Sequence, residues 1–447
     1  MRAALRFLAM IVAFAGCLVS CEALGIDLNN DKSHFINECD SVYYKYNPSL
    51  RTKDTTSVRL PDDHPALQIM RERAYRLGKI AWAPVDYFPS KYGKFSPEGN
   101  YTGIPYSSAK EKDKYVGQDV SFYTFLTAVY NPKSVLYTER IDQPPYHGMN
   151  CSAYYGTVCS LTVEYALGID RPYTANQIGQ LENIKRVSRQ NFDACAPGDL
   201  VWRSGHIVLI TDVVRGAGEK VDSVEVLESL DNTTTIKWYA LDDFRIRWDT
   251  YDWILYRYTD LDKIEEDAFM VSWENPLDVK YRLEICCNRG DKAVYRDDET
   301  VVINILSDAY QQLEILDSEG EVVRESPISG VSDYPVEHLS PGLYRARLVD
   351  AEGNYSQYTF FEIVETSVSL RTQGKVYTIS FSSINAEPEF IVFCSYYGDH
   401  CFFSTIDEKD RKAGYKTIMC VGDTDDLYMK VHFKGTYGRI TNEMMPL

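Results

Sequence analysis

Motifs that bind phosphate groups or metal ions are missing from this sequence of 447 residues. It has no glycine-rich phosphate loop and no basic patch, and its formal net charge of −18 would be repelled by a nucleic acid backbone, so nucleic acid partners are excluded. It has no Cys-x-x-Cys pair, and its seven histidines are scattered. We therefore expect neither a structural zinc site nor any other metal or cofactor.

Long apolar runs are also scarce, because only the N-terminus contains one. Residues 7–19 are apolar and follow Arg2 and Arg6. The run is too short to span a bilayer but is typical of a secretory signal peptide. The sequence thus predicts an exported protein with a signal in residues 1–21 and an irregular tether in residues 22–60.

The end of the signal region indicates how the protein is held after export. Leu18-Val19-Ser20-Cys21 is similar to a bacterial lipobox, in which Cys21 would be lipidated and would anchor the chain to the membrane. The alternative is an ordinary signal peptide cleaved near Ala23. Both predict a protein of the bacterial cell envelope, either lipid-anchored or secreted.

Residues 61–262 combine helix and strand patterns. Apolar spacing predicts helices over 64–77, with Asp62 and Asp63 as N-cap candidates, and over 152–167, which ends at Gly168. Apolar, β-branched segments predict strands over 199–202, 206–214 and 223–229. We expect one α+β domain here.

The remaining sequence is rich in short alternating segments separated by turn signals, such as Val301–Leu306 and Gly342–Leu348. This pattern predicts one or two all-β, immunoglobulin-like sandwich modules, which we place at 263–366 and 367–447. Cys394 and Cys401 are spaced so that a hairpin could bring them together.

The candidate nucleophile in this sequence is Cys151, at the start of the helix expected over 152–167. A cysteine at a helix N-terminus lies near unpaired backbone N–H groups and the positive end of the dipole, which favour a thiolate and can stabilise an oxyanion. Cys159 lies two turns further on, on the apolar face of the same helix. We expect Cys159 to be inert core.

His206 is the candidate general base, because it begins a buried strand directly after Gly205. If the following hairpin is centred on Ala217, His206 and Glu228 are each eleven residues from the centre. Their Cβ atoms would then be roughly 5 Å apart on neighbouring strands, so Glu228 could orient the imidazole. A register slip would favour other side chains. The alternatives are Glu225, Ser229 and Asp231.

Two sequence blocks, in order, resemble the NlpC-type family of papain-like cell-wall cysteine peptidases. Asn150-Cys151-Ser152-Ala153 resembles the family's Asp-Cys-Ser-Gly motif. Pro197–Trp202 and Gly205–Ile210 resemble its Pro-Gly-Asp-Leu and Gly-His-Val-x-Ile strands. The resemblance covers about residues 60–258.

The resemblance implies a papain-like fold and metal-free cleavage of peptidoglycan stem peptides. It also implies a tyrosine beside the active site, for which Tyr106 is the candidate and Tyr101 the alternative. Ser152 and Gly205 are expected to contribute to substrate binding.

Three departures from the family pattern put the substrate in doubt: Asn150 replaces an aspartate, Ala153 a glycine, and Glu228 the commoner histidine. Because such surroundings select the acyl donor, an amidase or an acyl-ester hydrolase of the same fold is an alternative to the peptidase. A surface-adhesion lipoprotein without catalysis is a second alternative.

Overall fold

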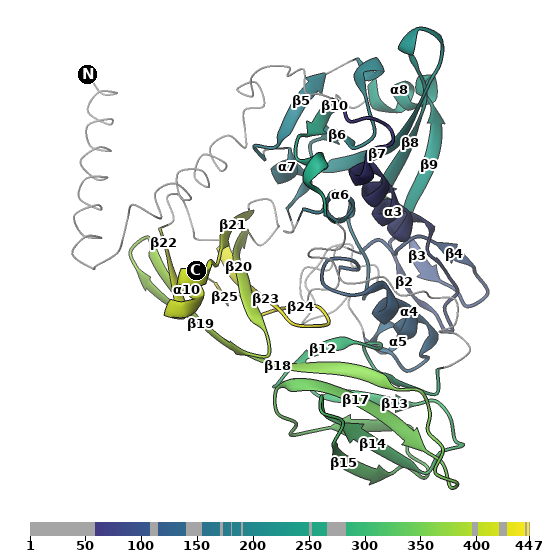
Figure 1. Ribbon diagram of the computed structural model, residues 1–447, viewed down its shortest axis with the longest axis vertical. Coiled ribbons are helices and arrows are strands. Elements are labelled where there is room, and N and C mark those ends of the chain that lie inside the picture. Colours follow the sequence, from purple (N-terminus) through teal and green to yellow (C-terminus); the bar gives the residue numbers. More distant parts are fainter. Residues whose placement is uncertain are drawn as a thin grey trace.

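The computed structural model describes the chain in three units (Figure 1), here called the N-terminal unit, the middle β unit and the C-terminal β unit. The described residues are 59–107, 115–139, 154–169, 173–179, 181–188, 191–249, 253–265, 283–395, 401–419, 427–442 and 445–446. The expected signal peptide, Cys21 and nearly all of the expected tether lie outside these residues. None of the helices in the described ranges has both the length and the apolar character that crossing a membrane requires.

The N-terminal unit is built on a six-stranded antiparallel sheet. In the order of the sheet its strands are β5 (Ile184–Ser188), β10 (Ile254–Tyr258), β6 (Asp199–Arg203), β7 (His206–Arg215), β8 (Val221–Ser229) and β9 (Thr234–Ala240). Three of these strands confirm the strands expected over 199–202, 206–214 and 223–229. Residues 206–211 of β7 are buried, as expected of a central strand.

Helices cover both faces of this sheet, and alternate residues of β7 contribute to two cores. Leu209 packs in the core beneath α3 (Pro65–Lys79) and α6 (Cys159–Leu167), whereas Val208 packs in the core beneath α8 (Leu241–Asp249). The shorter elements are β1 (Ala81–Trp82), β2 (Phe88–Ser90), β3 (Gly93–Phe95), β4 (Tyr101–Thr102), α4 (Phe122–Tyr130), α5 (Val135–Thr138), α7 (Ala175–Ile178), and the 3-10 turns η3 (Phe192–Ala194), η4 (Ala217–Glu219) and η5 (Leu261–Lys263).

Two helix starts differ from the expectation. The N-cap of α3 is His64, whose Nδ1 accepts from the N–H of Ala66, rather than Asp62 or Asp63. The helix expected over 152–167 begins only at Cys159, because Gly156 and Thr157 form β-bridges and Val158 is extended. Its end at Gly168, in the left-handed conformation with φ 68°, is confirmed.

The middle β unit is a sandwich of two sheets around one apolar core. One sheet contains β11 (Ile285–Cys287), β13 (Val301–Ile305) and β16 (Asp333–Val336), and the other β15 (Val322–Pro327), β14 (Gln312–Leu316), β17 (Gly342–Val349), β18 (Thr359–Gln373) and β12 (Ala293–Arg296). The expected β-sandwich class is therefore confirmed for this part of the chain.

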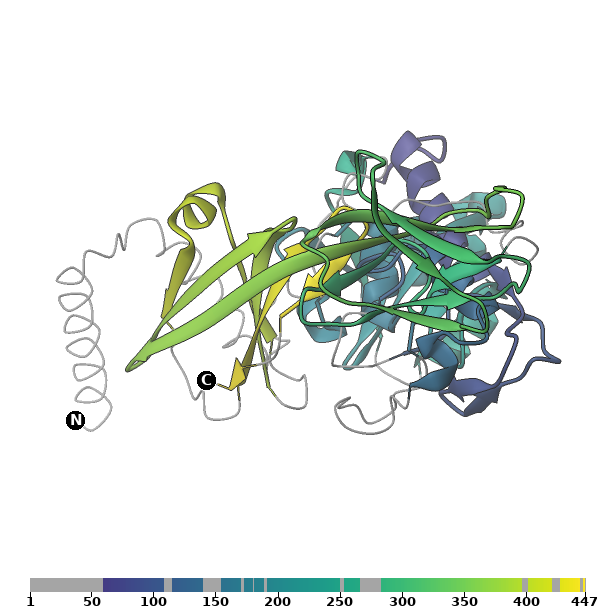
Figure 2. The ribbon, with the colours of Figure 1, turned by 90° about the horizontal axis from the view of Figure 1, so that it is seen from below.

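The C-terminal β unit shares a strand with the middle one. The 15-residue strand β18 pairs with β17 through its first half and with β19 through its second half, as Figure 2 shows. The expected boundary at 366/367 thus falls inside one continuous strand. The unit contains β19 (Val376–Ile384), β20 (Glu387–Ser395), β21 (Cys401–Thr405), α10 (Glu408–Ala413), β22 (Tyr415–Met419), β23 (Leu427–Lys434), β24 (Arg439–Thr441) and β25 (Met445–Pro446).

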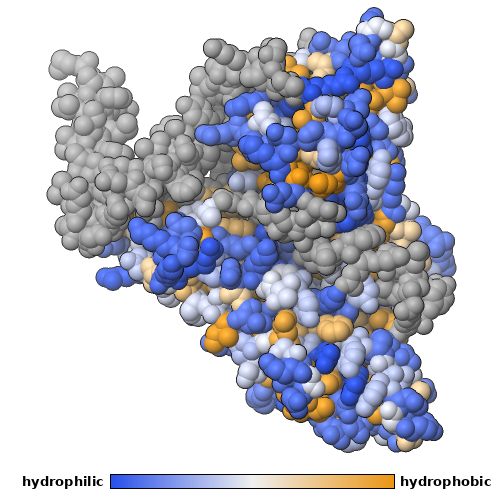
Figure 3. All heavy atoms as spheres, in the orientation of Figure 1, coloured by the Kyte–Doolittle hydropathy of each residue, from blue (hydrophilic) through white to orange (hydrophobic). Residues whose placement is uncertain are grey.

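Cys394 and Cys401 are opposite each other in the β20–β21 hairpin, as their spacing predicted. The face of the molecule in Figure 3 is mostly hydrophilic, and its hydrophobic residues form small separate groups.

Candidate active site

The nucleophile expected from the sequence, Cys151, lies outside the described residues, as does Ser152. A second cysteine, Cys159, is the first residue of α6 and is only partly buried. Its thiol lies close enough to His206 to raise the pKa of the imidazole. Cys159 packs against the apolar core as expected, but the expectation that it lies two turns inside the helix was wrong. The reason is the later start of the helix, which places Cys159 at its N-terminus rather than two turns inside it.

The position of Cys159 is fixed by the extended segment that precedes it. Thr157 forms a parallel bridge with Tyr106, and its N–H donates to the carbonyl of Pro105 at 3.0 Å. Gly156 pairs with Tyr115 in the same manner. Two β-branched residues at 157 and 158 favour this extended backbone over a helix. The chain therefore turns into α6 only at the cysteine.

The first turn of α6 can bind a developing negative charge. Within the described chain, the N-cap residue Val158 provides no side-chain hydrogen bond to this turn. The backbone N–H groups at the start of α6 are thus left to other acceptors, and the dipole of the nine-residue helix favours an anion there. A substrate oxyanion formed at the Cys159 sulfur would lie beside these groups.

His206 and Glu228 form the expected pair. The imidazole Nε2 and the Glu228 Oε1 are 2.9 Å apart, and both side chains are buried. The register differs from the expectation, since Leu209 is opposite Leu227, which places Glu228 opposite Val208 rather than His206. The offset of two residues arises at the turn, because Arg215 is opposite Val221 and the hairpin is therefore centred on Gly218 rather than Ala217; the bulges, one in each strand, cancel. A shift of two keeps both side chains on the same face, so they still meet diagonally.

The alternative third groups have other partners. Glu225 accepts hydrogen bonds from Tyr75 Oη at 3.0 Å and Thr211 Oγ1 at 2.9 Å. Ser229 Oγ donates to the carbonyl of Thr157 at 3.4 Å. Asp231 is exposed. Of the four candidates, Glu228 is the one that has a hydrogen bond to the imidazole.

The surroundings of His206 favour its charged form. Burial lowers the pKa of the imidazole, but hydrogen bonds to Cys159 and Glu228, together with their charges, outweigh this effect and raise the pKa to about 9. The buried ring of Trp253 packs edge-on against the imidazole, with 5.8 Å between centroids. This arrangement suits an imidazolium that lies between the Cys159 sulfur and the Glu228 carboxylate.

The two candidate tyrosines have different environments. Tyr101 packs in an aromatic cluster with Trp82 and Phe95, and its hydroxyl accepts from the N–H of Ser96 at 2.8 Å. Burial raises the pKa of Tyr106 to about 12, and the charge of Cys159 adds to the rise. Tyr106 is therefore the tyrosine that the structure brings close to the candidate nucleophile.

Gly205, expected to bind substrate, is exposed in the β6–β7 turn with φ +78°, a conformation that favours glycine. Its N–H donates to Asn176 Oδ1 at 3.0 Å. The structure thus gives Gly205 a role in the turn that leads into His206. In the described ranges, no group of three or more His, Cys, Asp or Glu residues is arranged to hold a metal ion.

The segment before Cys159 is linked to the other two units, directly to the middle one and through the turn at 115–120 to the C-terminal one. Tyr155 is buried, and its hydroxyl donates to the carbonyl of Arg289 in the middle β unit. The turn at 115–120, which pairs with Gly156, is held by Arg439 of the C-terminal β unit, whose Nη1 donates to Gln118 Oε1 at 3.1 Å. The position of the segment before Cys159 thus depends on all three units.

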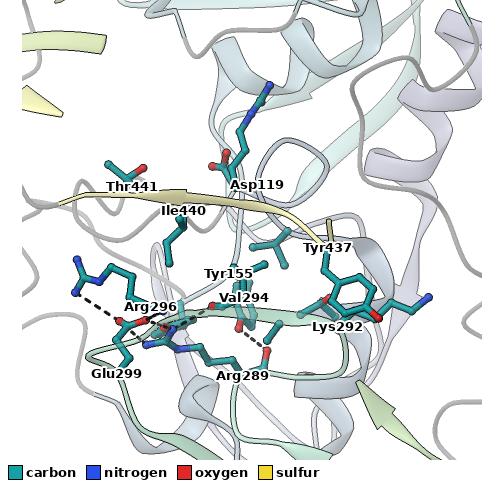
Figure 4. A pocket seen from close by; sticks show the side chains of 15 residues that line it. Asp119, Tyr155, Arg289, Lys292, Val294, Arg296, Glu299, Tyr437, Ile440 and Thr441 are labelled. Atoms are coloured by element: carbon teal, nitrogen blue, oxygen red, sulfur yellow. Dashed lines mark hydrogen bonds and ion pairs between the residues drawn. The ribbon is translucent and has the colours of Figure 1, made fainter. Parts of the chain in front are cut away.

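A cavity of about 70 Å³ lies where the three units meet (Figure 4). In this view Arg289 and Arg296 of the middle β unit both point toward Glu299, and the Arg289 Nη1 to Glu299 Oε2 distance is 2.8 Å. Tyr437 and Ile440 enter from the C-terminal β unit. None of the residues that line the cavity belongs to the Cys159–His206–Glu228 group.

Comparisons with known proteins add little to this geometry. No protein-family model and no curated protein matches the chain. Among solved structures the chain is similar to a cytokine receptor complex (15% identity, 36% of this chain and 94% of that chain, TM-score 0.25). It is also similar to a two-domain fibronectin type III segment of chicken tenascin (14%, 33% and 92%, TM-score 0.20) and to fibronectin(III)-like modules of Clostridium thermocellum CbhA (11%, 36% and 90%, TM-score 0.20).

TM-scores this low carry no argument about the whole chain. The β-sandwich class of the C-terminal part therefore rests on its own strands and their order.

Proposed function

We propose that this protein is a cysteine hydrolase in which Cys159 is the nucleophile, His206 the general base and acid, and Glu228 the group that orients and charges the imidazole. The observation that carries the proposal is the buried His206–Glu228 hydrogen bond of 2.9 Å, with Cys159 at the start of α6 close enough to His206 to raise its pKa. A buried pair of this kind beside a thiol at a helix N-terminus is the arrangement that nucleophilic catalysis by cysteine needs.

The mechanism follows from the positions of these groups. The Cys159 thiolate attacks the substrate carbonyl, and the backbone N–H groups at the start of α6 stabilise the oxyanion. The protonated His206 then donates its proton to the leaving group, which gives an acyl thioester. Neutral His206 next removes a proton from water, which hydrolyses the thioester and restores the thiolate–imidazolium pair.

We propose that the substrate is a peptidoglycan stem peptide and that the N-terminal unit has a papain-like fold. Support comes from the resemblance of Pro197–Trp202 and Gly205–Ile210 to the NlpC-type strands, which form β6 and β7. The Cys-Ser pair of the family motif occurs at Cys159-Ser160 as well as at Cys151-Ser152. Export to the cell envelope, with lipidation at Cys21, would place the enzyme at this substrate.

Digestion of purified peptidoglycan tests the proposal, with the soluble products identified by mass spectrometry. The wild type and Cys151→Ala should release the same new fragments, whereas Cys159→Ala should release none. The bond cleaved distinguishes a peptidase from an amidase. If Cys159→Ala keeps its activity and Cys151→Ala loses it, the nucleophile is Cys151 and the proposed triad is wrong. If the wild type releases nothing, peptidoglycan is not the substrate.

A further inference from the structure

The cavity where the three units meet is lined by more basic than acidic side chains, although the whole chain has 65 acidic and only 47 basic residues. The charged residues of its lining are Arg289, Lys292, Arg296, Arg439, Asp119 and Glu299. In the sequence the basic ones are interspersed with acidic residues, so no basic run marks this place. Folding gathers the cations, and a cavity with such a lining favours an anion.

Two guanidinium groups in this lining share one carboxylate. Arg289 Nη1 is 2.8 Å from Glu299 Oε2, and Arg296 Nη2 is 3.8 Å from Glu299 Oε1. All three side chains are mostly buried. The other acidic partner of Arg296 is Asp298, whose side chain is 69% exposed, so solvent screens its charge. The shielded positive charge at this place thus exceeds the shielded negative charge.

Arg296 also has a donor that is not satisfied. Its Nε is buried and makes no hydrogen bond with the described residues, although Asp298 Oδ1 lies 3.2 Å away. Burying a charged donor without an acceptor is costly. An anion in the cavity would both balance the charge and accept from this side chain.

Two further cations complete the lining. Lys292 lies across the cavity from Arg296 in Figure 4. Burial lowers the pKa of the Lys292 ammonium, so a nearby anion would stabilise its charged form. Arg439 comes from the C-terminal β unit, and its contacts with Glu389 at 2.7 Å and Gln118 at 3.1 Å hold it in place. A cation that is already fixed loses little entropy when a ligand binds.

The size of the cavity limits the ligand. A volume of about 70 Å³ has room for several water molecules, and hence for one small oxyanion, but not for a nucleotide or a peptide. The hydroxyls of Tyr154 and Tyr437 also belong to the lining. Burial raises the pKa of both, so both keep their protons as donors. Guanidinium groups and hydroxyls together suit the oxygens of a phosphate.

We propose that this cavity is a binding site for phosphate, in which Arg296, Lys292 and Arg439 contact the ion. The bound ion balances the shared guanidinium charge and links the middle β unit to the C-terminal one. Because Tyr154 and Tyr155 line the same cavity, it also stabilises the segment that leads to Cys159. The free ion and the phosphate end of a monoester share this chemistry, and the volume favours the free ion. The inference does not depend on the proposed function.

Isothermal titration calorimetry of the purified protein at constant ionic strength tests the proposal. Phosphate should bind saturably at one site per chain, sulfate should compete with it, and chloride should not. Glycerol 3-phosphate should bind at least about tenfold more weakly, because the cavity has no room for its body. Tighter binding of glycerol 3-phosphate would instead assign the site to a phosphomonoester. If neither compound binds saturably, the proposal is wrong.

Arg296→Met tests whether the ion binds in this cavity. It should weaken phosphate binding at least about tenfold, as expected for the loss of a charge-assisted hydrogen bond. Arg347→Met is the matched control, because Arg347 is in the same unit and forms an equally buried ion pair with Glu314 at 2.8 Å. It should leave the affinity unchanged. Equal affinities of Arg296→Met and the wild type would overturn the proposal.

Thermal denaturation distinguishes a binding role of Arg296 from a structural one. Phosphate should raise the Tm of the wild type and of Arg347→Met, but not that of Arg296→Met. Without phosphate, Arg296→Met should lower the Tm less than Arg347→Met does. The reason is that losing Arg296 relieves an excess of positive charge, whereas losing Arg347 leaves Glu314 without this partner. A larger loss in Arg296→Met, with no effect of phosphate on the wild type, would show that Arg296 is structural.

Discussion

At the scale of single residues, the charge on His206 decides the pH range in which the site can work. The fold raises the pKa of this imidazole from its ordinary value of 6.5 to about 9, so the folded state favours the protonated form. The resulting stabilisation is complete below pH 6.5 and is lost as the pH rises through about 9. The deprotonation of His206 in this pH range also removes the proton that the leaving group needs.

We therefore predict that kcat/KM falls on the alkaline side with an apparent pKa near 9. Glu228→Gln removes the negative charge that Glu228 presents to His206. It should move the alkaline fall in kcat/KM toward lower pH by roughly one unit or more. It should also reduce kcat/KM at its maximum at least about tenfold. A pH–rate profile of both proteins measures the shift. Glu225→Gln is the control, because Glu225 contacts Tyr75 and Thr211 rather than His206. In this variant kcat/KM should fall at nearly the same pH as in the wild type.

Single residues also show where sequence reasoning reaches its limit. His206 and Glu228 were predictable, because a histidine at a strand start and a carboxylate on the returning strand share a face. The choice between Cys151 and Cys159 was not. The two Cys-Ser pairs are eight residues apart, close to two helical turns, so both fit the same apolar periodicity. Only the start of the helix separates them, and the β-branched residues at 157 and 158 are the signal that could have indicated it.

At the scale of elements, the close contact of two extended segments sets the position of Cys159, the proposed nucleophile. A Cβ added at Gly156 would lie 2.4 Å from Ser107 Cβ and 2.5 Å from the carbonyl oxygen of Pro105. Both neighbours belong to the segment that pairs with Thr157. Glycine at 156 is therefore required by the space between the segments, and any side chain there would push the start of α6 away from His206.

Gly156→Ala should accordingly lower kcat/KM by about ten- to a hundredfold, because a displacement of the nucleophile by about 1 Å is enough for such a loss. It should also cost roughly 1–3 kcal/mol of stability through overpacking. Steady-state kinetics and urea denaturation measure the two effects. Gly342→Ala, whose added Cβ would meet Tyr344 at an ordinary 3.5 Å, should change neither. Full activity in Gly156→Ala would show that this contact does not position Cys159.

Elements differ in how far the sequence predicts them. The strands β6, β7 and β8 follow from apolar β-branched runs bounded by glycine turns, which are local signals. The register of the β7–β8 hairpin does not, since Arg215 is opposite Val221, which centres the hairpin on Gly218 rather than Ala217, and this shift leaves no mark in the apolar pattern. The domain boundary expected at 366/367 failed for a related reason, because β18 continues through it and pairs in both β units.

At the scale of the whole molecule, buried polar contacts join the units. Asn131 Nδ2 donates to Asn304 Oδ1 at 2.7 Å, and the N–H of Val135 donates to the carbonyl of Asn288 at 2.8 Å. Both contacts link the N-terminal unit to the middle one. Separating the units would leave these groups buried or newly solvated without their partners, so we expect the described units to unfold together.

Arg439 is the residue that tests this coupling most directly. Its Nε is 2.7 Å from Glu389 Oε2 within the C-terminal β unit, and its Nη1 contacts Gln118 in the turn that pairs with Gly156. Arg439→Met breaks both contacts and leaves the mostly buried Glu389 without this partner. We expect a loss of about 2–3 kcal/mol, somewhat less than for a fully buried pair, together with a reduced kcat, because the support of the nucleophile segment is weakened.

Differential scanning calorimetry and kinetics of Arg439→Met test the two halves of this expectation. The transition should stay single and move to a lower temperature, and kcat should fall although Arg439 is remote in sequence from Cys159. Lys412→Met is the control, because the ion pair of Lys412 with Glu408 is exposed and should contribute less than about 1 kcal/mol. If the variant instead shows an early transition of the C-terminal β unit alone and an unchanged kcat, then that unit is an independent appendage rather than a support of the active site.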